Sequence, residues 1–283
     1  MERFAGRNVV VTGASRGIGA ALAERLAAEG ANVAVVARTV EAHDHLAGSL
    51  GETLARCRRY GARAEAIAAD LADAESRAAI IPRALELFDG RIDVLVNNAA
   101  AAIYQPTVEF PLKRRRITFE VNVHAPADLA QAVIPGMAAR GEGWIVNVSS
   151  ASARYEPGRP KELRKPPPFI GVYGASKAAL NRMTAAFAAE LLGSGIRVNT
   201  VEPRAAVMSE GAEALVGGTL APELIESMEA MVEGALVLCD CPADWTGGVH
   251  VSLHLLDALG RTVMTLDGSR PYPGGQRPAA RAD

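Results

Sequence analysis

The sequence predicts an α/β fold in which one doubly wound parallel sheet carries helices on both faces. Short β-branched runs alternate with longer segments of helical periodicity from residue 8 onward, as in a series of strand–helix units. The run at 92–96, Ile-Asp-Val-Leu-Val, is apolar at all but one position, which is typical of a parallel strand covered on both sides. Glycine, acidic, amide and hydroxyl residues follow the predicted strands, and such sheets bind ligands at the carboxyl ends of their strands.

The composition favours a soluble, cytoplasmic protein. The chain has 283 residues, 49% of them hydrophobic, but no apolar run reaches the ~20 residues that span a bilayer. The N-terminus lacks the long apolar stretch of a signal peptide. A formal net charge of −2 gives no overall basic field, so neither nucleic acid nor a membrane is an expected partner. Cys239 and Cys241 have no second ligand pair, so no metal site is predicted.

A glycine-rich turn follows the first predicted strand, at 8–12, and precedes a predicted helix at 20–29. Glycine lets the backbone turn tightly and approach a ligand, and the helix N-terminus beyond it offers free N–H groups to a pyrophosphate. The spacing is G-x-x-x-G-x-G, which differs from the G-x-G-x-x-G dinucleotide fingerprint. Strand before and helix after still favour dinucleotide binding, with contacts from Gly13, Ser15, Arg16, Gly17, Ile18 and Gly19.

The end of the second predicted strand, at 32–37, favours NADP(H) over NAD(H). An acidic residue at this place would bind the ribose 2′-hydroxyl, whereas arginine accommodates a 2′-phosphate. Here Arg38 follows the strand without an Asp or Glu, and Arg16 lies in the first turn. Two solvated arginines are the alternative interpretation.

The later predicted strands also end in polar residues. The strand at 64–69 runs into Asp70 and Leu71, placed to meet an adenine edge, and the strand at 92–96 runs into Asn97-Asn98-Ala99. The strand at 144–148 ends at Ser149-Ser150. Helices are predicted between these strands at 41–60, 75–88 and 113–140; the last begins with a basic turn that we interpret as solvated or in contact with another subunit.

Tyr173 and Lys177 lie four residues apart in a predicted helix that runs to Leu192, so their side chains share one helix face. A free phenol titrates near ~10, and a neighbouring cation lowers that pKa. Such a tyrosine can exchange a proton with an alcohol or carbonyl oxygen near neutral pH.

In order and spacing, these residues resemble the classical short-chain dehydrogenase/reductase family over roughly residues 5–205. The resemblance implies a Rossmann-type sheet of about seven strands, an assembly as homodimer or homotetramer, and hydride transfer between NADP(H) and a carbonyl or secondary alcohol. It implies a catalytic set of Asn122, Ser150, Tyr173 and Lys177. The cofactor residues that it implies are those of the glycine turn with Arg38, Asp70, Leu71, Asn97, Ala99, Tyr173, Lys177 and Pro203.

The resemblance also implies a role for each catalytic residue. Tyr173 exchanges a proton with the substrate oxygen, and Ser150 positions and polarises that oxygen. Lys177 stabilises the phenolate and holds the nicotinamide ribose, and Asn122 anchors a water that links Lys177 to solvent. A catalytically silent NADP(H)-binding regulator or scaffold is the alternative function.

The chain departs from the family pattern in four places. Ala100 stands where the family has a glycine, and a surplus segment at 156–168 precedes Tyr173; that segment contacts substrate, alters subunit packing or is a plain surface insertion. After Pro203 the usual glycine is Arg204, which suggests an anionic or acyl-thioester substrate. Met208 stands where the family has a carboxamide-binding threonine, with Ser209 as its candidate substitute.

The fourth departure is the C-terminal part of a single domain expected over 1–270. Residues 205–245 are expected to form a substrate-side lid, with lid helices between 212 and 237. An apolar helix at 249–259 and a strand at 262–266 are predicted to follow, and the tail at 271–283, rich in Pro, Gly and Arg, is expected to be disordered.

Overall fold

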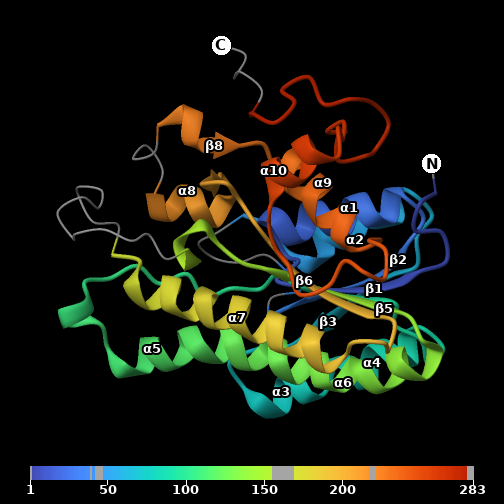
Figure 1. The fold of residues 1–283 in the computed structure, drawn as a ribbon, viewed down its shortest axis with the longest axis horizontal. Coiled ribbons are helices and arrows are strands. Elements are labelled where there is room, and N and C mark those ends of the chain that lie inside the picture. Colours follow the sequence, from blue (N-terminus) through green and yellow to red (C-terminus); the bar gives the residue numbers. More distant parts are fainter. Residues whose placement is uncertain (1, 39, 42–46, 155–168, 217–220, 279–283) are drawn as a thin grey trace.

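A single seven-stranded parallel sheet forms the centre of the molecule (Figure 1). The computed structural model describes residues 2–38, 40–41, 47–154, 169–216 and 221–278. The strand order is β3-β2-β1-β4-β5-β6-β9. The first three strands are therefore added outward from β1 on one side, and the later strands are added outward from β4 on the other side. The predicted doubly wound sheet of about seven strands is confirmed. Its strands are β1 Asn8–Thr12, β2 Asn32–Ala37, β3 Ala64–Ala68, β4 Val94–Asn97, β5 Gly143–Val148, β6 Ile196–Glu202 and β9 Val249–Val251.

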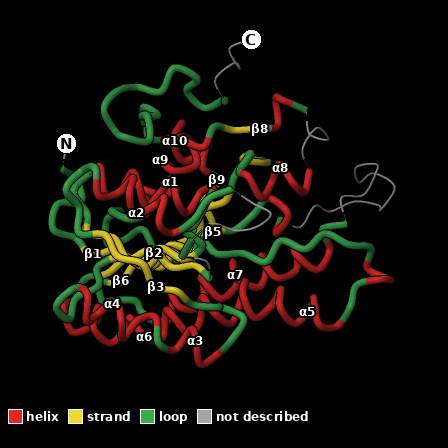
Figure 2. The backbone as a smooth tube through the Cα atoms, turned by 180° about the vertical axis from the view of Figure 1, so that it is seen from behind, coloured by secondary structure: helices red, strands yellow, loops and turns green. Residues whose placement is uncertain are grey.

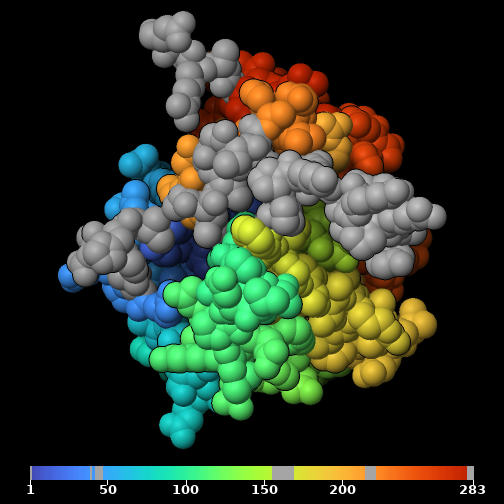
Figure 3. All heavy atoms as spheres, turned by 90° about the vertical axis from the view of Figure 1, so that its left-hand side faces the viewer, coloured from blue at the N-terminus to red at the C-terminus, as the bar shows by residue number. Residues whose placement is uncertain are grey.

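Helices cover both faces of the sheet, as Figure 2 shows from behind. Each face buries its own apolar cluster, one against α1 and α9 and the other against α4 and α6. On the face of the molecule turned to the viewer in Figure 3, α5 and α7 lie side by side. One layer contains α1 Gly17–Ala28, α2 Leu50–Arg58, α9 Met228–Leu238 and α10 Ser252–Ala258; the other contains α3 Ala74–Ala78, α4 Ile80–Leu87, α5 Leu112–Phe119, α6 Ala125–Arg140 and α7 Gly171–Glu190.

Two predicted helices are shorter than expected for local reasons. In the helix predicted at 41–60, α2 begins at Leu50, because Gly48 adopts a φ of +96° and the Ser49 hydroxyl accepts a hydrogen bond from the N–H of Glu52. The helix predicted at 75–88 is divided at Ala79 into α3 and α4. Pro82 lacks the N–H that would otherwise continue the ladder through this point.

The C-terminal part differs most from expectation. Met228–Leu238, expected within the lid, is buried along most of its length and packs against α1, α10 and β6, so α9 is a core helix. The seventh strand is Val249–Val251, paired with Thr200–Glu202, at the start of the helix predicted at 249–259. The open edge of β6 supplies backbone partners that override the helical pattern of this short run. The rest of that predicted helix forms as α10, Ser252–Ala258. Residues 262–266 form no strand and carry one isolated bridge, between Met264 and Pro271.

The segment after Ser269 is docked onto the helical layer of α9 and α10. The buried Ser227 donates from its N–H to the carbonyl of Gln276, at 2.9 Å, and from its hydroxyl to that of Gly275, at 2.8 Å. The prediction that the tail is disordered from residue 271 is therefore wrong for residues 271–278. Residues 279–283 and the surplus segment at 156–168 lie outside the described residues. Within the described ranges, no helix is both long and apolar enough to cross a membrane.

This docking predicts that the segment contributes to stability. A chain ending at residue 268 leaves the N–H and hydroxyl of Ser227 without their partners inside the protein, so we expect the free energy of unfolding to fall by at least about 2 kcal/mol. Urea unfolding measures the change. A chain ending at residue 278 is the matched control, and equal stability of the two truncated chains would contradict the docking.

Candidate functional site

The glycine turn fits closely against the turn that follows β4. Gly13 has a φ of +66°, and a Cβ added there would lie 2.7 Å from the Cα of Ala99. A Cβ on Gly19 would lie 2.4 Å from the Nδ2 of Asn98. The Thr12 hydroxyl accepts hydrogen bonds from the N–H groups of Asn98 and Ala99, each at 3.1 Å. Both glycines are therefore required by close approach, and the two turns form one unit at the carboxyl edge of the sheet.

The N-terminus of α1 already holds an anionic group. Its first N–H, on Gly17, donates to a carboxylate oxygen of Glu210 at 3.0 Å. Glu210 begins α8 Glu210–Val216, and Ser209 lies directly against Gly17. The Nε of Arg16 is buried and has no hydrogen-bond partner among the described residues. The first N–H of the helix thus binds a carboxylate, and Glu210 stands where the sequence predicts a phosphate.

The other predicted cofactor residues lie along the same edge. Arg38 is exposed at the end of β2, while Ser15 and Leu71 are buried and Ile18 is partly buried. Asp70 shapes its own turn, accepting from the N–H of Ala72 at 3.0 Å. Asn97 donates to the Oδ1 of Asn147 at 2.8 Å, and its own Oδ1 is buried without a hydrogen-bond partner in the described residues. Pro203 directly follows β6 and is buried.

Tyr173, Lys177 and Ser150 converge at the ends of α7 and β5. Tyr173 and Lys177 share one face of α7, with the Lys177 ammonium 6.0 Å from the centre of the Tyr173 ring. That ammonium donates to the carbonyl of Val148 at 2.7 Å. Ser150, two residues further along, lies close enough to the Tyr173 phenol to lower its pKa. Three of the four predicted catalytic side chains therefore surround one point.

Asn122 connects to the site through buried hydrogen bonds. It is fully buried in a π-helical turn, Glu120–His124, that joins α5 to α6. Its Oδ1 accepts from the N–H of Ala101 at 2.8 Å, and its Nδ2 donates to the hydroxyl of Ser176 at 2.9 Å. That hydroxyl donates in turn to the carbonyl of Tyr173 at 2.7 Å. The amide is hydrogen-bonded at both ends, and the water that Asn122 is expected to anchor stays a prediction.

Burial controls the proton affinities of the pair. It lowers the pKa of the Lys177 ammonium to about 8. It also raises the pKa of the Tyr173 phenol, with the neighbouring Tyr104 adding to the rise and the hydrogen bond with Ser150 opposing it. The sequence predicted that Lys177 would lower the pKa of this phenol. That prediction is wrong, because the phenol is taken out of water and desolvation is the largest influence on its pKa.

Tyr104 is a neighbour of the site that the sequence interpretation missed. It lies in the loop after β4, with its ring centre 5.5 Å from that of Tyr173. Burial raises the pKa of its phenol as well. A loop tyrosine has no periodicity or fixed spacing to reveal it, and its nearness to the Asn97–Ala99 turn was the one available signal.

The segment after Pro203 is engaged with its own neighbours. Arg204 donates from its guanidinium to the carbonyl of Glu223 at 3.1 Å, in the 3₁₀ turn Pro222–Leu224 that precedes β8 Ile225–Glu226. The hydroxyl of Ser209 accepts from the N–H of Ala212 at 3.2 Å. β8 pairs with β7 Ala206–Val207 as a separate two-stranded sheet. Arg204 is therefore held by this small sheet and its turn.

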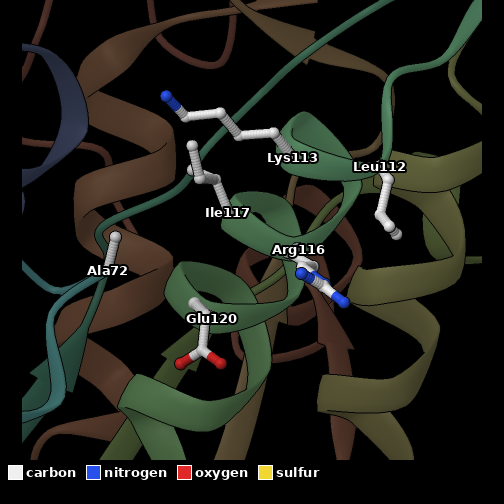
Figure 4. Close-up of a pocket in the computed structure, with 6 residues that line it drawn as sticks. All are labelled: Ala72, Leu112, Lys113, Arg116, Ile117 and Glu120. Atoms are coloured by element: carbon white, nitrogen blue, oxygen red, sulfur yellow. The ribbon is translucent and has the colours of Figure 1, made fainter.

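The basic turn of α5 borders an open hollow of about 720 Å³ (Figure 4). Lys113 and Arg116 extend from α5 to different sides of this hollow. They therefore do not converge on a shared anion, which fits the interpretation of a solvated turn. The lining residues are Ala72, Leu112, Lys113, Arg116, Ile117 and Glu120.

Comparisons with known proteins identify the family of the chain. The family model described as short chain dehydrogenase matches residues 7–214. The chain is 33% identical over 203 residues to the ketoacyl reductase HetN of Nostoc sp. strain PCC 7120, covering 72% of this chain and 64% of that protein. This chain thus spans less than two thirds of that relative's length.

Solved structures show the same fold. A short chain dehydrogenase from Mycobacterium thermoresistibile superposes with a TM-score of 0.78 at 32% identity, covering 90% of this chain and 88% of that one. One from Burkholderia cenocepacia J2315, in complex with NADP, superposes with a TM-score of 0.71 at 31% identity, covering 88% and 97%. Family match, sheet order and site geometry agree, and the chain belongs to the short-chain dehydrogenase family.

Proposed function

We propose that this protein is an NADP(H)-dependent reductase of a carbonyl substrate, acting through Tyr173, Ser150 and Lys177. Membership of an oxidoreductase family supports the general reaction. The observation that carries the proposal is the meeting of a buried phenol, a hydroxyl and a buried ammonium from two separate elements, α7 and the turn after β5. Asn122 supports the same point from the π-helical turn.

The residues along the sheet edge fit a nicotinamide dinucleotide. The N-terminus of α1 binds the carboxylate of Glu210, and the Nε of Arg16 beside it has no hydrogen-bond partner among the described residues, as expected of a place that takes an anion. The end of β2 carries the exposed Arg38 and no carboxylate, which favours a 2′-phosphate. The NADP-bound relative from Burkholderia cenocepacia supports the same cofactor. When bound, the cofactor supplies the hydride, and the protein supplies orientation and proton transfer.

Tyr173 is suited to act as the acid. Because burial raises the pKa of its phenol, the group stays protonated at neutral pH and can donate to the oxygen of a carbonyl as negative charge develops there. Ser150 lies close enough to the same phenol to affect its pKa and is placed to hold that oxygen. Alcohol oxidation needs the phenolate instead, so we expect this direction to require a more alkaline pH. A phenol that is protonated at neutral pH is ready to donate its proton in the reductive direction.

Lys177 is the charged partner in this arrangement. Its ammonium makes one hydrogen bond, to the Val148 carbonyl, which leaves donors for a ribose hydroxyl of the cofactor. A positive charge beside the phenol also stabilises the phenolate left after proton transfer.

We expect the protein to work as a homodimer or homotetramer, as the family resemblance implies.

The reaction is tested by following NADPH oxidation with a panel of ketones and aldehydes, with NADH as the alternative cofactor. We expect turnover with NADPH, and we expect Tyr173→Phe to lower it at least about 100-fold while NADPH affinity stays within a few fold. Tyr104→Phe, at the neighbouring ring, is the matched control and should keep most activity. Tight NADPH binding without turnover on any substrate would identify a silent regulator instead, and an active Tyr173→Phe would refute the role of the phenol.

The contact between Glu210 and Gly17 predicts competition with the cofactor. The carboxylate takes an N–H that the pyrophosphate needs, so Glu210→Gln should lower the Kd for NADPH about two- to fivefold. Fluorescence titration with NADPH measures the Kd. Glu213→Gln removes the same charge from the same helix and should leave the Kd unchanged; equal Kd values for wild type and Glu210→Gln would contradict the competition.

The buried ammonium of Lys177 predicts a pH-dependent cost in stability. Below about pH 8 Lys177 is protonated in the folded and the unfolded chain, so folding bears the full cost of the buried charge. Between about 8 and 10.5 the unfolded chain binds more protons, and stability rises with pH. The difference between the two pKa values, 10.5 and about 8, corresponds to about 3 kcal/mol in the free energy of unfolding.

Lys177→Met removes this pH dependence. Urea unfolding at pH 7 and at pH 10 measures how much more stable the variant is than wild type. This gain in the free energy of unfolding should be larger at pH 7 than at pH 10, by on the order of 3 kcal/mol. Lys113→Met, at an exposed lysine, is the control and should show no such difference. An advantage of Lys177→Met that is the same at both pH values would contradict a buried charged lysine.

A further inference from the structure

Arg154 joins the turn after β5 to the end of β6. Its Nε pairs with Glu202 Oε1 at 2.6 Å. Its Nη2 donates to the carbonyl of Pro203 and its Nη1 to that of Arg204, each at 2.9 Å. All three nitrogens of the guanidinium therefore bind three consecutive residues of one strand end, a fixed fork that the single ammonium of a lysine cannot reproduce.

The pairing with Glu202 explains why an arginine is needed at this place. Glu202 is 1% exposed, and its second carboxylate oxygen is buried without a hydrogen-bond partner among the described residues. A buried carboxylate without a cation is strongly destabilising. The contacts to the two carbonyls are additional to this neutralisation, and they fix the position of the backbone.

Ser150 lies at the other end of the same short turn. Its hydroxyl accepts from the N–H and the hydroxyl of Ser152, at 3.2 and 2.9 Å. Its carbonyl accepts from the N–H of Ala153 at 2.9 Å, and that of Ala151 accepts from the N–H of Arg154 at 3.3 Å. The stretch from Ser150 to Arg154 is thus a single hydrogen-bonded turn, anchored to β5 at one end and to β6 by Arg154 at the other.

We propose that Arg154 is a positioning residue of the active site, whose fork on Glu202, Pro203 and Arg204 holds the Ser150 hydroxyl against the Tyr173 phenol. The proposal rests on the proposed reductase function. Arg154 touches neither the phenol nor the ammonium in the structure, and it acts through Ser150. The same fork fixes the strand end at Pro203, beside the expected nicotinamide site.

The test removes the fork without leaving a buried charge. Arg154→Met combined with Glu202→Gln should lower kcat at least about tenfold, with the Kd for NADPH within about twofold of wild type. The pH profile of alcohol oxidation should move to higher pH, as in Ser150→Ala, because the hydrogen bond with Ser150 opposes the rise of the phenol's pKa. Arg154→Lys keeps the charge and should lose part of the activity with the fold intact.

The coupling with Ser150 separates positioning from general destabilisation. In a Ser150→Ala background the Arg154→Met/Glu202→Gln change should cost less than about twofold more in kcat, because the hydroxyl that the fork positions is gone. A control pair of similar exposure lies far along the chain, where Arg261 and Glu233 are 39% and 0% exposed, against 35% and 1% for Arg154 and Glu202. Glu233 also pairs with the buried Arg25, which keeps Glu29 as its partner when Glu233 is changed. Arg261→Met/Glu233→Gln should leave the pH profile unchanged. Any factor that it costs in kcat should be the same with and without Ser150→Ala.

Two results would overturn the proposal. If the Arg154 change costs the same factor with and without Ser150, or leaves kcat unchanged, Arg154 is structural and the reductase function stands. If wild type transfers no hydride to any carbonyl while binding NADPH, the proposed function fails and the positioning role fails with it.

Discussion

The hydrogen bond from the buried ammonium of Lys177 to the carbonyl of Val148 is the contact on which the site depends. Val148 is the last residue of β5, two positions before Ser150, and Lys177 is one helical turn from Tyr173. One bond between a helix and a strand end therefore sets the spacing of the three groups that we propose to carry the chemistry. The ammonium is buried at a cost, since burial lowers its pKa to about 8. A lysine kept in this position against that cost is expected where the charge has a function.

A buried chain of polar side chains holds α7 in register with the sheet. Asn147 of β5 donates to the Thr184 hydroxyl of α7 at 2.8 Å, and Thr200 of β6 contacts the same hydroxyl at 3.0 Å. Asn97 of β4 donates to Asn147 at 2.8 Å. Because the side chains span three strands and one helix, sliding α7 along the sheet would break several buried hydrogen bonds together. The lysine contact and this network hold α7 at two points along its length.

The features that the sequence predicted are those with a local cause. The strands and the glycine turn follow from runs of residue types, and the pairing of Tyr173 with Lys177 follows from helical spacing. The features that it missed depend on contacts between distant segments. The strand Val249–Val251 is too short for a periodic pattern and exists because β6 offers it an edge. An apolar run of Ala, Leu and Met fits a lid or a core helix equally well, and only its packing against α1 identifies α9 as core.

Electrostatics was the least predictable part. Spacing along a helix places Lys177 beside Tyr173, but the sign of the change in the phenol's pKa depends on how far both groups are removed from water. The contact of Glu210 with Gly17 joins segments 193 positions apart in the chain, and the fork of Arg154 joins two strand ends 48 positions apart. No pattern within a window of residues reveals such pairs.

A crystal structure of the protein with NADP(H) tests the proposed site most directly. We expect the nicotinamide ring to lie beside the Tyr173 phenol and the Ser150 hydroxyl, with the Lys177 ammonium within hydrogen-bonding distance of the adjoining ribose. A cofactor bound along the sheet edge with its nicotinamide away from these three side chains would contradict this expectation.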